Sequence, residues 1–170
     1  VGSPYVRESL GANWSLAASG PGDAGPSESP DDSEWTAIEV LAPVSAALRT
    51  LQRWSLDHSA TRFDSQNWWY QRRFDAPLMQ TGDRVILGLD GLATVANVWL
   101  NGVEVLRSDN MFIAHECDVT AHLLPTGNTL LLRFTSLDSQ LAIRRKRPRW
   151  RAPMIENQQL RWFRTTLLGR

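Results

Sequence analysis

A chain of 170 residues, of which 42% are apolar and 21% charged, has the composition of one ordinary globular domain that can bury a core. No run of 18 apolar residues is present, which excludes a transmembrane helix, and the first ten residues lack the pattern of an intact signal peptide. The net charge is zero but uneven, because residues 140–170 carry nine basic residues against one acid.

The first part of the chain is expected to be irregular in two places. Residues 1–9 are predicted to form a loose leader, followed by a single domain over residues 10–168. Residues 19–33 are rich in Gly, Pro, Ser and Asp and almost lack apolar side chains. This composition is typical of a loop insertion or a disordered insertion.

One short helix is predicted near residues 44–53. Pro43 is a suitable start, and four apolar residues recur on one helical face: Val44, Ala47, Leu48 and Leu51. We therefore expect a buried stripe on this helix and no functional role for it.

Strand-like apolar runs separated by turn residues occupy most of the remaining chain. The clearest pair, residues 95–100 and 103–106, is joined by Asn101-Gly102, and both of these residues accept the positive φ of a type I′ turn. Further strands are predicted at residues 13–16, 35–41, 68–74, 84–89, 114–119 and 129–134.

About eight strands with a single helix predict an all-β fold, an antiparallel β-sandwich. Its core is expected to include or border Val95, Val98, Leu100, Leu131 and Phe134. In residues 68–74 the side chains should alternate, with Trp69 on one face and Trp68 and Tyr70 on the other.

No pattern of residues indicates an active site, a metal site or a cofactor site. His58, His115 and His122 lack metal-ligand spacing with other donors. Cys117 lies in a strand-like run, where a small buried thiol is expected rather than a nucleophile. A phosphate-binding glycine loop, a nucleophile elbow and a CxxC pair are missing from the sequence. We therefore expect no catalytic residue, no metal and no cofactor.

Basic residues concentrate in residues 144–151, where six of eight are Arg or Lys. Such a run occurs in nucleic-acid patches, but here it stands without a recognisable nucleic-acid-binding fold. A solvated or interdomain basic loop is the favoured interpretation, with no nucleic acid and no membrane among the partners.

Tryptophan is abundant, with eight in the chain. In a β-sandwich such residues are expected to serve packing. Sugar-stacking platforms or a domain interface are the functional alternatives.

Several motifs, in their order and spacing, resemble the N-terminal β-sandwich domain of family 2 glycoside hydrolases. Residues 13–16, NWSL, resemble the family's opening GNWSL strand, and residues 67–74, NWWYQRRF, resemble its DWWYRRxF strand. The hairpin containing VWLNG, the following SDNMF and the strand ending in DVT complete the match, and DNMF is similar to the β-mannosidase branch. The resemblance implies a jelly-roll sandwich of the galactose-binding-domain-like type.

The resemblance also implies a non-catalytic role. In the family, both catalytic glutamates lie on a separate (β/α)8 barrel, which takes roughly 250 residues. The chain alone is therefore expected to lack enzymatic activity. Its implied role is to scaffold the barrel and to border the glycone −1 subsite for a carbohydrate, such as a terminal β-mannoside, in the full-length protein.

Arg164 is the one substrate-binding residue that the resemblance implies. Residues 158–165, QQLRWFRT, resemble the family stretch NxxRK, with Arg164 at the arginine position and Thr165 where β-mannosidases have lysine. A guanidinium fork suits sugar hydroxyls, and pairing at a domain interface is the alternative role. Because the family pattern continues into WDWGP and a final strand, residues 140–170 are expected to be a basic tail with an incomplete final segment.

Two other interpretations stay open: a freestanding carbohydrate-binding module with tryptophan stacking platforms, and a non-sugar interaction module that uses the basic tail. One cysteine is compatible with cytoplasm or periplasm, and 17 arginines against one lysine favour a bacterial origin. Exposed aromatic residues and an unpaired strand edge near residues 140–170 would promote self-association or poor order.

Overall fold

The computed structural model describes residues 6–22, 25–57, 61–146, 149–155 and 157–163. Within them lie eight strands: β1 (Ala12–Ser19), β2 (Thr36–Val40), β3 (Asn67–Phe74), β4 (Ile86–Leu89), β5 (Ala96–Leu100), β6 (Val103–Ser108), β7 (His115–Asp118) and β8 (Asn128–Phe134). The helices are α1 (Val44–Thr50) and α2 (Leu137–Ala142), with short 3-10 helices η1 (Pro26–Glu28), η2 (Asp32–Glu34), η3 (Phe63–Ser65), η4 (Thr120–His122) and η5 (Gln158–Trp162).

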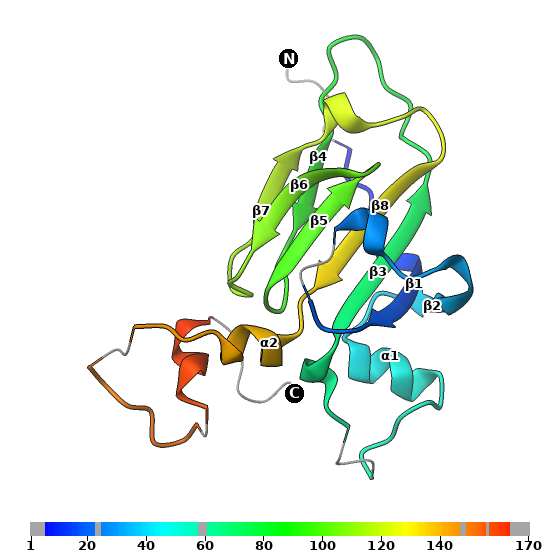
Figure 1. Ribbon diagram of the computed structural model, residues 1–170. Coiled ribbons are helices and arrows are strands. Elements are labelled where there is room, and N and C mark those ends of the chain that lie inside the picture. The colour runs from blue at the N-terminus through cyan, green and yellow to red at the C-terminus, as the bar shows by residue number, and fades with distance from the viewer. Residues whose placement is uncertain (1–5, 23–24, 58–60, 147–148, 156, 164–170) are drawn as a thin grey trace.

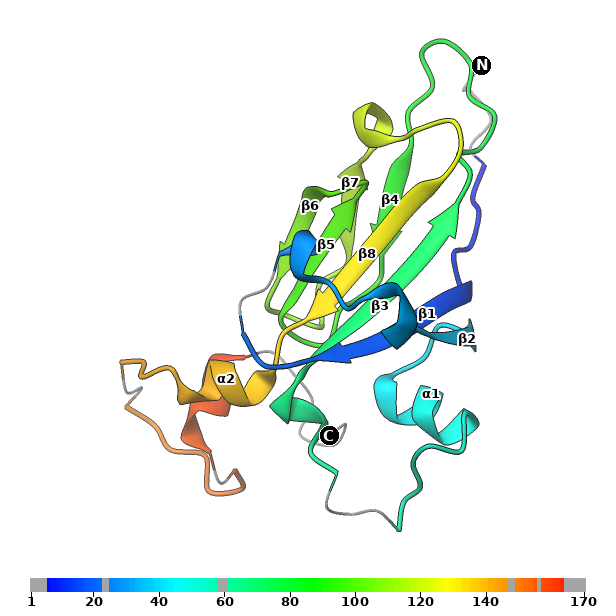
Figure 2. The same ribbon diagram turned by 45° about the vertical axis from the view of Figure 1, so that its right-hand side comes forward.

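The strands form two antiparallel sheets, as Figures 1 and 2 show. The larger has six strands in the order β2-β1-β3-β8-β5-β6, and the smaller pairs β4 with β7. The predicted antiparallel β-sandwich is therefore confirmed, and each predicted strand has a counterpart. We call the face of the six-stranded sheet that packs on β4, β7 and α1 its inner face, and the opposite face its outer face.

The β5–β6 hairpin has the predicted turn. Asn101 and Gly102 both have positive φ, 51° and 83°. The side chain of Asn101 also reaches the neighbouring strand connection, because its Nδ2 donates to the carbonyl of His122 and its Oδ1 accepts from the backbone N–H of Thr129. The turn residue thus fixes the hairpin to the start of β8.

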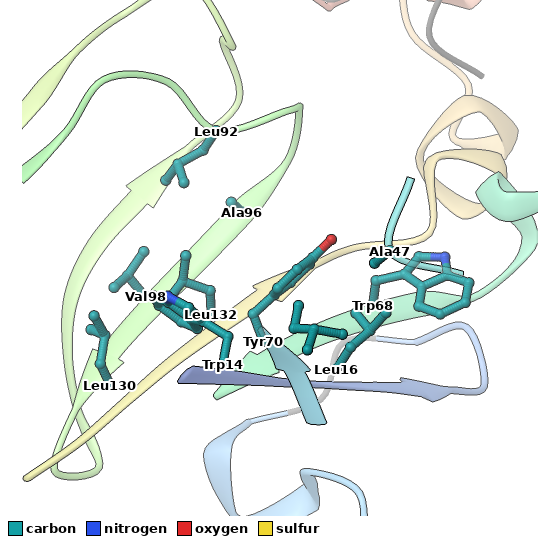
Figure 3. Close-up of a cluster of buried hydrophobic side chains, with 11 residues drawn as sticks. Trp14, Leu16, Ala47, Trp68, Tyr70, Leu92, Ala96, Val98, Leu130 and Leu132 are labelled. Atoms are coloured by element: carbon teal, nitrogen blue, oxygen red, sulfur yellow. The ribbon is translucent and has the colours of Figure 1, made fainter. Parts of the chain in front are cut away.

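The main core lies on the inner face. Trp14, Leu16, Trp68, Tyr70 and Leu132 contribute buried side chains to it from three strands, and Figure 3 shows how they pack. The predicted alternation in β3 is confirmed, because Trp68 and Tyr70 belong to this cluster whereas Trp69 faces the outer side. Of the predicted core residues, Val98, Leu100 and Leu131 are buried, Phe134 packs on the main cluster, and Val95 packs on a smaller cluster beside α2.

Helix α1 covers the part of the inner face near β1, β2 and β3. Its predicted apolar stripe is confirmed, since Ala47 is buried in the main core and Val44, Leu48 and Leu51 pack against it. The helix ends at Thr50, three residues before the predicted end. Gln52 has a positive φ of 57°, and the N–H of Arg53 turns back to the carbonyl of Leu48, which closes the helix in a Schellman-type cap.

Two buried side chains of β3 form hydrogen bonds to the segment between β2 and β3, which contains α1. The hydroxyl of Tyr70 donates to the carbonyl of Ala42, just before the helix, and the indole N–H of Trp68 donates to the carbonyl of Phe63, after it. Both distances are 2.9 Å. Strand β3 therefore determines where α1 sits, and burial raises the pKa of the Tyr70 hydroxyl above its usual range.

The described residues of the insertion that follows β1, 20–22 and 25–33, lie over the outer face of the large sheet. Its segment with η1 and η2 crosses β8 and β5 in Figure 1. Trp35, directly after η2, packs on a cluster of Trp69, Trp99 and Leu131 and donates its indole N–H to the carbonyl of Pro30. The described residues of the insertion thus form a cover over one face of the sheet.

Beneath this cover, an arginine lies against a stacked pair of tryptophans. The Trp69 and Trp99 rings stack at 6.0 Å, and the guanidinium of Arg133 lies within 6 Å of both ring centres. Arg133 is 2% exposed and donates to Oδ1 of Asn97. Such cation–π contacts allow a buried charge to be accommodated in an otherwise apolar cluster.

Candidate functional site

One end of the sandwich collects the elements that follow β8. Because adjacent strands are antiparallel, the end of β8 lies beside the starts of β3 and β5, and the turn after β6 lies at the same end. Helix α2, η3 and η5 are found there, as Figures 1 and 2 show. We call this region the helical end.

Helix α2 is joined to the sheet through its first residues. The hydroxyl of Ser136 accepts from the N–H of Ser139 and donates to the carbonyl of Asp64, while the Ser136 N–H donates to Oδ1 of Asn67. Arg62 and Asp138 add an ion pair of 2.6 Å. Helix α2 was not predicted from the sequence, because six residues are too few to show a helical period.

Residues 143–163, which we call the C-terminal segment, return onto α2. Phe163 is 7% exposed and packs with Leu137 and Leu141, and Leu160 packs at the edge of this cluster. The guanidinium of Arg145 lies 5.0 Å from the Phe163 ring centre. Phe163 therefore anchors the segment within this chain.

Polar contacts hold the loop before η5. The side-chain amide of Gln158 donates to the carbonyls of Ala152 and Ile155 and accepts from the N–H of Ala152. The guanidinium of Arg161 donates to the carbonyls of Gln158 and Trp150 and lies 5.2 Å from the Trp150 ring centre. Arg161 thus serves the internal structure of the segment.

The C-terminal segment carries an exposed aromatic and basic surface. Trp150 is 57% exposed and Trp162 is 42% exposed. Other large apolar side chains exposed on the segment are Ile143 and Met154, and the exposed basic residues described there are Arg144, Lys146, Arg149 and Arg151. A surface rich in both kinds of side chain is typical of an interaction site.

The other six tryptophans serve packing. Trp14, Trp68, Trp69 and Trp99 are buried, and Trp35 and Trp54 are half-buried against neighbouring rings or apolar residues. The packing interpretation therefore holds for both faces of the large sheet, and Trp150 and Trp162 are the two exposed tryptophans in the part of the chain that the structure describes.

The turn between β6 and β7 belongs to the same end and contains the SDNMF motif. Oδ1 of Asn110 accepts from the N–H of Phe112, which leaves the Phe112 ring 66% exposed. A Cβ on Gly91 would lie 2.6 Å from the carbonyl oxygen of Met111, so the neighbouring turn can approach only because residue 91 is glycine. The sequence alone does not show that SDNMF and α2 lie at the same end of the sandwich, which follows from the strand register.

Arg164 and Thr165 lie outside the described residues. The described part of their motif ends at Phe163, the buried anchor of the C-terminal segment. Among the residues that the structure describes, no group of three or more His, Cys, Asp or Glu could hold a metal ion, and no helix is long and apolar enough to cross a membrane.

Comparisons with solved structures agree with this architecture. A β-D-mannosidase from Dictyoglomus thermophilum superposes with a TM-score of 0.68 at 21% identity, over 88% of this chain and 18% of that protein. A β-glucuronidase from Faecalibacterium prausnitzii gives 0.57 at 24% identity, over 78% of this chain and 22% of that one. At such identities the likeness shows the fold.

Sequence comparisons identify relatives among β-mannosidases. The chain is 45% identical to β-mannosidase B of Thermothelomyces thermophilus over 69 residues, which are 41% of this chain and 8% of that protein. It is 40% identical to β-mannosidase B of Aspergillus flavus over 84 residues, 49% of this chain and 10% of that protein. The chain thus spans a tenth or less of these curated relatives at the matched region.

A family model described as the glycosyl hydrolase 2 galactose-binding domain-like family matches residues 28–167. This match includes seven of the eight strands and both helices. The resemblance drawn from the hairpin, the β3 motif and SDNMF is thereby confirmed, including the galactose-binding-like form of the sandwich and its β-mannosidase-like branch. The chain belongs to the glycosyl hydrolase 2 galactose-binding domain-like family.

Proposed function

We propose that the chain is the non-catalytic sandwich domain of a β-mannosidase-like glycoside hydrolase. In this role it supports a separate (β/α)8 barrel and borders the glycone −1 subsite, where a terminal β-mannoside or related β-glycoside binds. The observation that carries the proposal is the placement of both exposed tryptophans, Trp150 and Trp162, on one anchored segment at the helical end. The relatives named β-mannosidase support the substrate class.

The chain's own residues would position substrate, and the barrel would supply the acid/base and nucleophilic carboxyl groups. Arg164 directly follows Phe163, whose ring is fixed between α2 and Arg145. A rigid, permanently charged guanidinium next to such an anchor suits binding to sugar hydroxyls or orientation of a carboxylate. The exposed basic residues and Trp162 would face the barrel.

The test is made in a longer protein that contains this chain and a barrel. Arg164→Ala should lower kcat/KM for an aryl β-mannoside by about 10- to 100-fold while leaving the melting temperature unchanged, because a charge-assisted hydrogen bond in the transition state is lost. The matched control is Arg107→Ala, which removes an exposed arginine paired with Glu104 on β6. Unchanged kinetics for Arg164→Ala would remove the residue from the subsite.

The isolated chain provides a second test. It should show no turnover of aryl β-mannosides, since the barrel carboxylates belong to another domain. Turnover by a preparation cleared of host glycosidases would contradict the non-catalytic role.

The exposure of Trp150 and Trp162 also favours the second candidate, a freestanding carbohydrate-binding module. A module of this kind would use these two exposed rings as its stacking platforms. Retention of the isolated chain on insoluble mannan, lost in the Trp150→Ala/Trp162→Ala double variant, would support it over the scaffold role.

A further inference from the structure

Helix α1 has an outward face that lines an open pocket. The pocket has a volume of about 570 Å³ and is lined by Ser45, Ala46, Arg49, Thr50, Trp54 and Leu56. This volume lies within the range of small-molecule sites, roughly 300–1,000 Å³. None of these lining residues belongs to the C-terminal segment. For the helix itself, the sequence predicted only a buried apolar stripe.

The α1 pocket combines polar groups on one wall with an apolar wall opposite. Ser45 and Arg49 are one helical turn apart, as are Ala46 and Thr50, so both pairs lie on the same side of the helix. Arg49 is exposed and makes no ion pair with any residue that the structure describes. A hydroxyl and a guanidinium are therefore available to a ligand.

Trp54 forms a fixed wall of the pocket. Its ring meets the Phe63 ring edge-on at 5.3 Å, and Phe63 packs in turn on Trp68 of the core. The Trp54 indole N–H is buried and has no hydrogen-bond partner among the residues that the structure describes. Buried donors without an acceptor are rare in folded proteins, which makes this ring an unusual feature of the pocket wall.

These features match the chemistry of a sugar ring. A pyranose presents an apolar C–H face that packs on an aromatic ring, with hydroxyl oxygens at its edge that accept from N–H donors. Leu56, which is 71% exposed, extends the apolar wall beside Trp54. We propose that the α1 pocket is a carbohydrate-binding site, in which Trp54 and Leu56 pack on the sugar ring and Arg49 and Ser45 hydrogen-bond its hydroxyls.

The choice of carbohydrate as the ligand class rests on the proposed function, whereas the existence of the pocket does not. The proposed function and the assignment of the pocket can therefore fail separately. Glycosidase activity of a longer protein tests the proposed function, and sugar binding by the isolated 170-residue chain tests the pocket.

The experiment is a calorimetric and NMR titration of the chain with D-mannose, methyl β-D-mannoside and β-1,4-mannobiose. Ala46→Leu should weaken binding by about tenfold or more, because it fills an exposed pocket position with a good helix former. Trp54→Phe keeps an aromatic ring and removes the indole N–H, and Arg49→Gln removes the charge. Each should weaken binding, and amide shifts should map to residues 44–56.

The control variant is Leu78→Ser, which alters a fully exposed apolar side chain in the loop between β3 and β4, outside the pocket, and should leave the affinity within about twofold. Should Ala46→Leu fail to fold, Arg49→Gln decides in its place. Saturable binding that survives these pocket variants, or is lost only in the Trp150→Ala/Trp162→Ala double variant, overturns the assignment. So does the absence of saturable binding of all three sugars.

Discussion

Asn101 has two structural roles that substitutions can separate. It adopts a positive φ in the β5–β6 turn, and its side chain bonds to the backbone near β8 and to Oδ1 of Asn128. Asn101→Ala loses both and should lower the free energy of unfolding by about 2–3 kcal/mol. Asn101→Gly loses only the hydrogen bonds and should cost about 1–2 kcal/mol.

Chemical denaturation of the two Asn101 variants measures this difference. Equal losses for alanine and glycine would show that the positive φ carries no cost at this turn.

Asp118 links the end of β7 to Arg84 and Thr120. Hydrogen bonds from the Thr120 side chain and from Arg84 lower the pKa of the carboxyl from its usual 3.8 to about 2. Because the folded-state pKa is lower than the unfolded one, these contacts stabilise the fold above pH about 4, and this contribution is lost as the pH falls toward 2. The stability difference between the native chain and Asp118→Asn should therefore shrink over that interval.

Carboxyl-carbon NMR follows the titration of Asp118 directly, and denaturation at several pH values follows the stability. A titration midpoint near 4 would contradict the strength of these hydrogen bonds in solution.

The cover formed by the insertion makes a prediction for a whole element. Trp35 holds it against Trp69 and Trp99, so Trp35→Ala should lower the free energy of unfolding by about 2–3 kcal/mol, within the range for large-to-small substitutions. The near-ultraviolet circular dichroism of the stacked pair should change as well. Trp150→Ala, at an exposed site, should change stability by less than about 0.5 kcal/mol.

If Trp35→Ala leaves both signals unchanged, the insertion is a passive loop and does not stabilise the sheet. The comparison with Trp150→Ala removes the general effect of losing one tryptophan.

For the molecule as a whole, the exposed surface of the C-terminal segment predicts self-association of the isolated chain. Trp150, Trp162 and Met154 expose large apolar area there, and β2 and β6 are edge strands of the large sheet. Sedimentation velocity over a concentration series should show oligomers that Trp150→Ser/Trp162→Ser reduces. Hydrogen exchange should show weaker protection in residues 140–163 than in β3 and β8.

Leu78→Ser is the matched control, because Leu78 is fully exposed in a loop far in sequence from the C-terminal segment. A concentration-independent monomer with a protected C-terminal segment would contradict the prediction and favour the freestanding-module interpretation.

Much of the fold could be predicted from local patterns. Asn101-Gly102 predicts its turn because few residues accept positive φ, and alternation in β3 predicts its two faces because successive side chains of a strand point to opposite sides. The stripe of α1 follows from the helical period. The ordered motifs, read together, also predicted the family.

Tertiary structure decided what local patterns cannot encode. The burial of Phe163 against α2 and the cover over Trp69 and Trp99 both depend on contacts between residues far apart in sequence. The position of SDNMF at the same end of the sandwich as α2 depends on the pairing of distant strands. Composition gives the number of tryptophans but does not show that Trp150 and Trp162 are exposed while the other six are packed. The same holds for the unpaired indole N–H of Trp54, because burial and the presence of an acceptor are properties of the packed molecule and not of the residue.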